Sequence, residues 1–407
     1  MRSEKIKLLF VNDSLALAGG EKSLVSLLSN LDENKYEIDL QLFRYGCELE
    51  SQLPKYVNLL PEKKLTVFMR NSLGKTIKKV LNSEHAKMLI SRLRFSIKLR
   101  TGKTTDPAVA QIFWETLGHC VERNPKKYHV AIAYSQGVPT FYVNEKVFAA
   151  KKIAWVNANL EFDGDNTVFQ RKHYASYDKI VTVSEFTRDH MRRIFPEFRY
   201  KIATIYDLID YKNIVRMAEE KISDFSSEKF TILTVARLVE FPKGFRITLE
   251  TCKLLKEKGL NFHWYVIGDG TYRCEMVKFI AENHLENYLT LLGRKINPYP
   301  YFKKADLYVQ TSYSEGFGLS IAEARMLNTP VVTTKYDSVN IQIFDGENGL
   351  VTSIDPQCVA QAIEKLMNDR TLYSRIVSNL KKEQKENTEP ITKFDKEIGS
   401  LGLEVAG

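Results

Sequence analysis

The stretch "YSEGFGLSIAEA", residues 313–324, places two carboxylates, Glu315 and Glu323, on either side of a Gly-Phe-Gly turn. Gly316 and Gly318 carry no Cβ, so a ligand can come close to the backbone at this turn. We expect a helix to begin near Gly318, with Glu323 about one and a half turns into it. A carboxylate there can accept hydrogen bonds from adjacent hydroxyls, such as a ribose diol, each worth roughly 1.5–3 kcal/mol. Either glutamate alone also fits helix capping and solvation, which is the commoner role.

Short apolar stretches alternate with helical patterns on both sides of this turn. "KIKLLFV" and "HVAIAY" in the first half, and "FTILTVA" and "DLYVQT" in the second, are typical of buried strands. Such alternation predicts parallel sheets with helices on both faces. The predicted fold class is therefore α/β, with two doubly wound, Rossmann-like domains facing each other across a cleft. Ligands of such sheets bind outside the carboxyl ends of the strands, which here means in the cleft.

The alternation restarts near Phe230, after the polar stretch "EEKISDFSSEK". We therefore predict a first domain at residues 1–225 and a second at residues 226–385. The tail, residues 386–407, is a candidate for a helix that crosses back to the first domain. A length of 407 residues agrees with more than one domain.

Composition narrows the class of protein. A hydrophobic content of 44% with 27% charged residues is typical of a globular chain and argues against disorder. No apolar run approaches the roughly 18 residues of a membrane span, and "IKLLFV" is too short for a secretory core. Five scattered cysteines without a C-x-x-C pair argue against a disulfide framework or a zinc site. A reducing cytoplasm fits this cysteine usage best.

Three further stretches join a strand to a helix. "VNDSLALAGGEKSL" brings Gly19 and Gly20 to a helix start, whose free amides and dipole favour an anion. "TVARLVEFPKGF" places Arg237 and Lys243 after a strand, where two cations can hold a diphosphate. A plain turn and ordinary surface solvation are the alternatives. "VIGDGTYR" has the G-x-G of a dinucleotide fingerprint without its third glycine, and so it favours a dehydrogenase only weakly.

With these residues, the second half of the chain resembles the donor domain of family 4 glycosyltransferases, which are retaining enzymes of the GT-B fold. The resemblance runs from "LTVARLVEFPKGF" through "YVIGDG", "LLGR", "KKADLYVQTSYSEGFGLSIAEA" and "NTPVVTT" to "GENGLV". Glu315 and Glu323 form the E-x7-E motif of that family. The first half matches more sparsely, through "AGGEKSL" and "VTVSEFTRDHM".

The resemblance implies a nucleotide diphosphosugar donor, with a UDP-sugar favoured, and a role for each matched residue. Glu323 would bind the ribose, while Glu315 would hold the donor sugar as a positioning and electrostatic group. Arg237 and Lys243 would neutralise the leaving diphosphate. The other implied donor-binding residues are Gly19, Gly20, Arg294, Gly316, Phe317, Gly318 and Leu319. The implied reaction uses no metal and no cofactor, because cations and helix amides stabilise the leaving charge.

Two positions in the first half leave alternatives open. Many relatives carry a histidine near the donor sugar where "AWVNANLEF" has Asn157, and an asparagine cannot share a proton at neutral pH. The sugar preference is therefore not implied by the resemblance. Asp163 and Asp165 in "FDGDN" resemble the D-x-D metal motif of the other large glycosyltransferase fold, although an acidic turn is the simpler interpretation.

The net charge of +9 is concentrated in one segment. Residues 63–103 contain twelve Lys or Arg and a single acid, Glu84, which leaves the remainder slightly acidic. Leu, Ile, Met and Phe are interspersed at helical spacing, as in a basic helix that lies on an anionic membrane. An ordinary solvated helix face is the alternative, and no nucleic-acid fold or aromatic interleaving favours a nucleic-acid partner.

The sequence therefore predicts a cytoplasmic enzyme, peripheral on the inner face of the membrane, that transfers a sugar to a glycan or lipid-linked acceptor in cell-surface polysaccharide or glycoconjugate synthesis. One rival is a nucleotide-sugar epimerase of the same fold, which would need acid-base residues that the sequence does not identify. Another is a sugar-nucleotide-binding protein without turnover. The intact motif residues argue against this second rival, whereas Asn157 keeps it open.

Overall fold

A computed structural model describes residues 5–70, 83–101, 105–158, 161–162, 164–225 and 228–401. The chain forms two compact units. Unit 1 comprises residues 1–208 together with 388–407, and unit 2 comprises residues 209–387.

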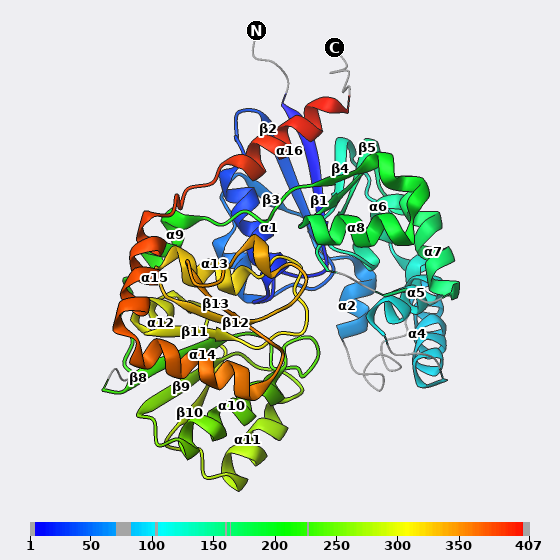
Figure 1. Ribbon diagram of the computed structural model, residues 1–407. Helices are drawn as coiled ribbons and strands as arrows, with labels where there is room; N and C mark the ends of the chain where they lie inside the picture. The colour runs from blue at the N-terminus through cyan, green and yellow to red at the C-terminus, as the bar shows by residue number, and fades with distance from the viewer. Residues whose placement is uncertain are drawn as a thin grey trace. The chain divides into compact units, whose positions relative to one another are not determined.

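Unit 1 is built on a seven-stranded parallel sheet (Figure 1). Its strands are β1 (Ile6–Asn12), β2 (Tyr36–Leu42), β3 (Val57–Leu59), β4 (Lys127–Ala133), β5 (Phe148–Val156), β6 (Lys179–Thr182) and β7 (Ile202–Thr204), in the order β3-β2-β1-β4-β5-β6-β7. Its helices are α1 (Gly19–Asn30), α2 (Lys64–Arg70), α4 (Ser83–Thr101), α5 (Asp106–Leu117), α6 (Val138–Lys146), α7 (Gly164–Ala175), α8 (Glu185–Ile194) and α16 (Glu389–Ser400).

Unit 2 repeats this plan with a six-stranded parallel sheet. Its strands are β8 (Phe230–Val235), β9 (Phe262–Ile267), β10 (Leu289–Gly293), β11 (Leu307–Gln310), β12 (Val331–Thr334) and β13 (Gly349–Thr352), in the order β10-β9-β8-β11-β12-β13. Its helices are α9 (Tyr211–Met217), α10 (Phe245–Glu257), α11 (Arg273–Glu282), α12 (Tyr299–Lys304), α13 (Leu319–Met326), α14 (Pro356–Asn368) and α15 (Arg370–Lys382).

Both sheets are buried on their two faces, which explains the near-continuous apolar strands of the sequence. In β1, Leu8 and Phe10 belong to one core cluster, and Leu9 and Val11 belong to the cluster on the opposite face. Each sheet also has a switch point, which is a pair of neighbouring strands at which the strand order reverses. From this pair the chain builds the sheet outward first in one direction and then in the other. The switch lies between β1 and β4 in unit 1 and between β8 and β11 in unit 2. Ligands of open parallel sheets bind at such points.

The structure divides the chain at other positions than the sequence predicted. Unit 2 begins at Ile209 rather than at residue 226, because α9 packs against α12 and α13. Ile214 and Phe225 are buried in the core of unit 2, so the polar stretch at which the sequence placed the domain boundary lies inside that unit. The second division falls after Asn387, and α16 packs on unit 1, where the Phe394 ring stacks on Phe10 at 6.1 Å.

Candidate functional site

The loops that follow β8 and β11 interlock at the switch point of unit 2. Gly244, at the end of the first loop, has φ +66°, and a Cβ on it would lie 2.2 Å from the carbonyl oxygen of Thr311. The Thr311 hydroxyl donates to the carbonyl of Gly244 at 2.9 Å. Only glycine permits this close approach of two backbones. The approach brings Lys243 beside Glu315.

Glu315 is held by three donors on one carboxylate oxygen. Its Oε1 accepts from Lys243 Nζ at 2.6 Å, from Gln310 Nε2 at 2.8 Å and from Ser312 Oγ at 2.6 Å. Tyr308 orients Gln310 by donating to its Oε1 at 2.8 Å, and burial raises the pKa of Tyr308, which keeps that donor protonated. The carboxylate is thus fixed, and an ammonium group stands beside it. Such a pair can orient a hydroxyl and stabilise an anion next to it.

The turn after Glu315 leads into α13 as the sequence predicted. Gly318 has φ +83°, a left-handed conformation that favours glycine, and it is the N-cap of the helix. The first amides of a helix have no intrahelical partner, so those of Leu319 and Ser320 are available to an anion, whereas the Ile321 amide donates to the carbonyl of Gly318 at 3.0 Å. Phe317 is half-buried, and its carbonyl accepts from Gln342 Nε2 at 3.4 Å.

Glu323 lies on the buried side of α13, where its exposed fraction is 4%. The Tyr299 hydroxyl, from α12, donates to its Oε1 at 3.2 Å. Burial and the neighbouring carboxylate raise the pKa of Tyr299 well above its usual value, so this donor also stays protonated. Glu323 is therefore a carboxylate with a fixed orientation inside the unit.

The remaining predicted residues of unit 2 also follow strands at this edge of the sheet. Arg237 comes directly after β8 and Arg294 after β10, and both are exposed. In the part of the chain described, the Arg237 guanidinium has no hydrogen-bond or ion-pair partner, and no contact joins it to Glu315. The structure thus brings Lys243 and Glu315 into direct contact and places Arg237 on the same edge without contact to them.

The G-x-G of "VIGDG" has a structural explanation. A Cβ on Gly268 would lie 1.9 Å from the carbonyl oxygen of Ala236, and one on Gly270 would lie 2.2 Å from that of Leu238. These glycines therefore allow the loops after β8 and β9 to pack backbone against backbone. Because this packing accounts for both glycines, they give no support to a dehydrogenase.

In unit 1 the structure brings two predicted residues together. Gly19 and Gly20 begin α1, and a Cβ on Gly20 would lie 3.5 Å from Nδ2 of Asn157, which follows β5. Asn157 Nδ2 donates to the carbonyl of Tyr134 at 2.6 Å, whereas its Oδ1 is buried and has no hydrogen-bond partner among the described residues. Asn157 therefore holds a fixed amide at the strand-end edge of this sheet.

Asp163, half of the alternative D-x-D motif, lies outside the described residues, and Asp165 is in the first turn of α7. No group of three or more metal-ligating side chains is found within the ranges that the structure describes. In the same ranges no helix combines the length and hydropathy needed to cross a bilayer.

Sequence reasoning missed Gln310, Ser312 and Tyr299, which orient the two glutamates. Gln310 ends the buried strand of "DLYVQTS" and Ser312 lies two residues beyond it, and a polar residue in such a place is a usable signal. Tyr299 has no local signal, because its role depends on the packing of α12 against α13.

Comparison with known proteins agrees with this architecture. Residues 215–383 match the family described as glycosyl transferases group 1. The capsular polysaccharide biosynthesis glycosyltransferase CapM of Staphylococcus aureus is 29% identical over 40% of this chain and 43% of its own length. The N-acetylgalactosamine-N,N'-diacetylbacillosaminyl-diphospho-undecaprenol 4-alpha-N-acetylgalactosaminyltransferase of Campylobacter jejuni is 28% identical over 49% of this chain and 53% of its own. The chain spans about half the length of these curated relatives.

Solved structures match over nearly the whole chain. Anabaena Alr3699/HepE in complex with UDP and glucose aligns with a TM-score of 0.67 and 17% identity, over 97% of this chain and 99% of its own. TarM of S. aureus aligns with a TM-score of 0.67 and 15% identity, over 98% and 99%. The predicted fold class is thereby confirmed, because the chain has the GT-B fold of these glycosyltransferases. The predicted resemblance to a glycosyltransferase is confirmed as well, by the match of residues 215–383 to the family of glycosyl transferases group 1.

Proposed function

We propose that this protein is a retaining glycosyltransferase that moves a sugar from a UDP-sugar to a hydroxyl of a glycan or lipid-linked acceptor, in the synthesis of a cell-surface polysaccharide or glycoconjugate. The observation that carries the proposal is the contact of Lys243 with Glu315 at the switch point of unit 2. It places a cation and a fixed carboxylate at the edge of the sheet where a nucleotide would bind.

In this proposal the donor lies along the strand ends of unit 2. Glu323 accepts hydrogen bonds from the ribose diol, and the amides at the start of α13 receive the diphosphate. Lys243 contributes a point charge to the same phosphates, and Arg237 supplies a second cation at this edge. The Oε2 atom of Glu315 remains for a hydroxyl of the donor sugar, since Lys243, Gln310 and Ser312 all donate to Oε1.

The difficult step is cleavage of the bond between the anomeric carbon and the diphosphate oxygen. Negative charge then accumulates on the leaving diphosphate, and groups that already point at it lower the barrier. Lys243 and the α13 amides are such groups, so the chemistry needs no metal ion. Glu315 keeps the sugar oriented and stabilises positive charge that develops at the anomeric carbon.

The names of related proteins support a UDP donor and an acceptor of this class. HepE has been crystallised with UDP-glucose, and the C. jejuni relative is named for a diphospho-undecaprenol acceptor. A Bacillus subtilis relative, 31% identical over 37% of this chain and 22% of its own length, is named poly(glycerol-phosphate) alpha-glucosyltransferase. An α-linked product from an α-linked donor requires retention of configuration, which favours a retaining reaction here.

Calorimetric titration of UDP and GDP in the presence of EDTA tests the donor site. We expect UDP to bind without metal, and Glu323→Ala to weaken this binding at least tenfold, because the ribose diol loses its acceptor. Glu347→Ala, which removes an exposed carboxylate of unit 2, is the matched control. Binding of neither nucleotide, or binding restored only by a divalent cation, would contradict the metal-free site.

Turnover separates a transferase from a binding protein. Release of UDP from a UDP-sugar in the absence of acceptor, with loss of the activity in Lys243→Ala, supports the transferase. Tight UDP binding without any consumption of UDP-sugars, alone or with lipid-linked acceptors, would favour the binding protein. Interconversion of sugar epimers without release of UDP would favour the epimerase.

We further propose that the protein is cytoplasmic and attaches to the inner face of the membrane through α4. Ile90, Leu93 and Ile97 are spaced by three and four residues on this helix, and they are 51%, 44% and 61% exposed. The basic residues Lys87, Arg94, Lys98 and Arg100 are exposed on the same helix. Apolar side chains flanked by cations favour the surface of an anionic bilayer.

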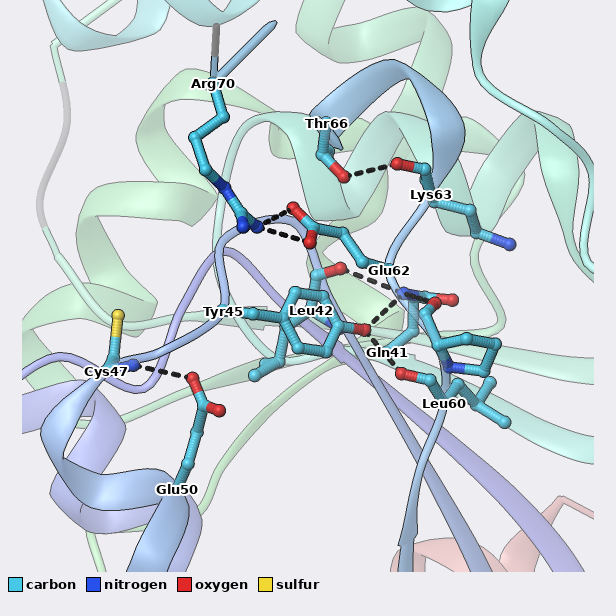
Figure 2. Close-up of polar contacts among 11 residues, drawn as sticks. Gln41, Leu42, Tyr45, Cys47, Glu50, Leu60, Glu62, Lys63, Thr66 and Arg70 are labelled. Carbon is cyan, nitrogen blue, oxygen red and sulfur yellow. Dashed lines mark hydrogen bonds and ion pairs between the residues drawn. The ribbon is translucent and has the colours of Figure 1, made fainter. Parts of the chain in front are cut away.

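Figure 2 shows two cations at the start of the basic segment, Lys63 and Arg70. Arg70, the last residue of α2, is bound by the carboxylate of Glu62. The ammonium group of Lys63 is half-buried and lies 5.4 Å from the centroid of the Tyr142 ring. Lys63 therefore contributes to the packing of unit 1, and Arg70 is paired with an acid although its side chain is 62% exposed. Residues 71–82 and 102–104 of the predicted segment lie outside the described residues.

Co-sedimentation with vesicles tests the attachment. We expect binding to phosphatidylglycerol vesicles at low salt and none to phosphatidylcholine vesicles. Replacement of Ile90, Leu93 and Ile97 by serine should abolish it, whereas Val277→Ser, at an exposed position of α11, should leave it unchanged. Failure of the wild type to bind anionic vesicles would refute this part of the proposal.

A further inference from the structure

The connection between β12 and β13 packs against the turn that follows Glu315. Its 3₁₀ helix η4 (Val339–Ile341) is flanked by Ser338 and Gln342, which are 2% and 1% exposed. The Ser338 hydroxyl donates to the backbone carbonyl of Glu315 at 2.9 Å, and Gln342 Nε2 donates to that of Phe317 at 3.4 Å. Two side chains of one connection thus hold two alternate carbonyls of the turn.

The direction of these carbonyls decides where the amides of the turn point. The peptide bonds that follow Glu315 and Phe317 are trans, and in a trans peptide the C=O and N–H groups point in opposite directions. The amides of Gly316 and Gly318 therefore face away from the connection. Neither amide donates to another group among the described residues. Gly318 is buried, and a buried amide without a partner is rare in folded proteins. A ligand at the turn would supply the missing acceptor.

Gln342 is itself held in one orientation. Its Oε1 accepts from Arg325 Nη1 at 2.6 Å, so its Nε2 is left to face the carbonyl of Phe317. Its backbone carbonyl accepts from Asn348 Nδ2 at 3.1 Å. Glu383 joins both supports, because its carboxylate accepts from Arg325 Nη2 and from Asn348 Nδ2, each at 2.9 Å. Rotation of the Gln342 amide would break its bond to Arg325 and bring two donors together.

The same part of the chain contacts the turn at two further points. Thr334, the last residue of β12, donates from Oγ1 to the carbonyl of Ser312 at 2.6 Å. A Cβ on Gly318 would lie 3.1 Å from the hydroxyl of Tyr336, which is 4% exposed. The backbone of the turn is therefore fixed at several places by residues that follow it in the chain by about 20 positions.

An anion fits the side of the turn to which the amides point. Leu319 and Ser320 add the free amides at the start of α13, and Lys243 stands beside Glu315. Successive backbone amides in a turn form concave sites that bind anions. The diphosphate of a nucleotide sugar is the anion that the proposed function supplies.

We propose that Ser338 and Gln342 are positioning residues of the donor site. By holding two carbonyls of the turn, they keep the amides of Gly316 and Gly318 aimed at the diphosphate of the donor. The inference rests on the proposed glycosyltransferase function, and it concerns unit 2 alone. Each side chain acts through the backbone that it holds. Loss of either one should therefore weaken the contacts to the phosphates and spare those to the nucleoside.

Calorimetric titration of UDP and of uridine, both in EDTA, measures the contribution of the phosphates as a ratio of two affinities. Gln342→Glu keeps the shape of the side chain and its bond to Arg325, but it places a carboxylate oxygen against the carbonyl of Phe317. We expect this variant to bind UDP about tenfold more weakly, and to bind uridine within about twofold of wild type. Gln361→Glu, exposed on α14 of the same unit, adds the same charge and should change neither affinity.

Ser338→Ala is a second, smaller change that tests the other carbonyl. It removes the donor to the carbonyl of Glu315, so UDP should bind about fivefold more weakly while uridine affinity stays unchanged. Ser353→Ala, at an exposed serine that follows β13, is the matched control. The ratio of the two affinities is a sound readout, because partial unfolding would lower both by the same factor. Equal losses for UDP and uridine in both variants would therefore overturn the positioning role.

The outcomes separate this inference from the proposed function. If wild type prefers UDP to uridine and both variants keep the wild-type ratio, the positioning role alone is refuted. If wild type binds UDP no more tightly than uridine, the proposed donor site fails and the positioning role fails with it. If the variants lose the preference for UDP but wild type consumes no UDP-sugar, the transferase is refuted while the positioning of the phosphate amides is supported.

Discussion

The Glu315 carboxylate at the strand-end edge of unit 2 and three polar side chains at the strand-end edge of unit 1 differ in how their oxygens are satisfied. In unit 2, Lys243, Gln310 and Ser312 all bind one oxygen of Glu315. In unit 1, oxygens of Asn12, Ser135 and Asn157 are buried without a hydrogen-bond partner among the described residues. A buried polar group without a partner costs about 1–3 kcal/mol.

This difference indicates how each edge meets its substrate. The edge of unit 2 is assembled before a ligand arrives, as charge stabilisation in a transition state requires. The edge of unit 1 instead holds buried oxygens that no described residue satisfies. Three predictions test this contrast.

The largest expected effect is on the folding of unit 2. Gly268→Ala would place a Cβ 1.9 Å from a backbone oxygen at φ +146°, so the interlocked loops cannot form. We expect a loss of more than about 4 kcal/mol and no UDP binding. Gly259→Ala is the matched control, because its φ is +71° and no atom lies within 4 Å of the new Cβ. Calorimetric unfolding should show a loss of only about 1 kcal/mol for that control. If the two variants lost the same free energy of unfolding, the close packing of these loops would not be required for the fold of unit 2.

The second effect is on the chemical step. Lys243→Ala removes the cation beside Glu315 and should lower kcat by about 10²- to 10³-fold, with a smaller change in the KM for the donor. Lys212→Ala, which removes an exposed lysine of unit 2, should be neutral. Steady-state rates of UDP release measure both. A loss below fivefold for Lys243→Ala would show that this edge is not assembled for catalysis.

The smallest effect concerns the edge of unit 1. Asn157→Ala removes the amide that bonds to Tyr134, and we expect about a tenfold loss of transfer rate from the loss of roughly one hydrogen bond. UDP affinity should stay unchanged, because the proposed nucleotide residues lie in unit 2. Asn30→Ala, at an exposed site of α1, is the control. If Asn157→Ala lowered UDP affinity as much as the transfer rate, the proposal that only unit 2 binds the nucleotide would be contradicted.

The sequence was sufficient for features that depend on local pattern. Alternating apolar strands and helices predicted two α/β units, and the spacing of Glu315, Gly318 and Glu323 predicted the turn and the helix that carry them. These features follow from periodicity and from the backbone freedom of glycine, which neighbouring residues determine.

Features that depend on tertiary packing were not predictable in the same way. The polar stretch before Phe230 resembles a linker, yet Phe225 within it contacts the Tyr265 ring, with centroids 4.4 Å apart. The direct pairing of Lys243 with Glu315 also requires two loops far apart in the chain to meet. Ser338 and Gln342 carry no motif, and their contacts with the turn arise only when the connection between β12 and β13 packs against it.

The return of the chain to unit 1 through α16 sets an order of assembly during synthesis. Phe10 and Trp155 emerge early from the ribosome, yet Phe394, which covers them, is made only after all of unit 2. At typical translation rates this delay is on the order of ten seconds or more. During that time the nascent unit 1 exposes an apolar surface, so its completion depends on α16, which is translated after unit 2.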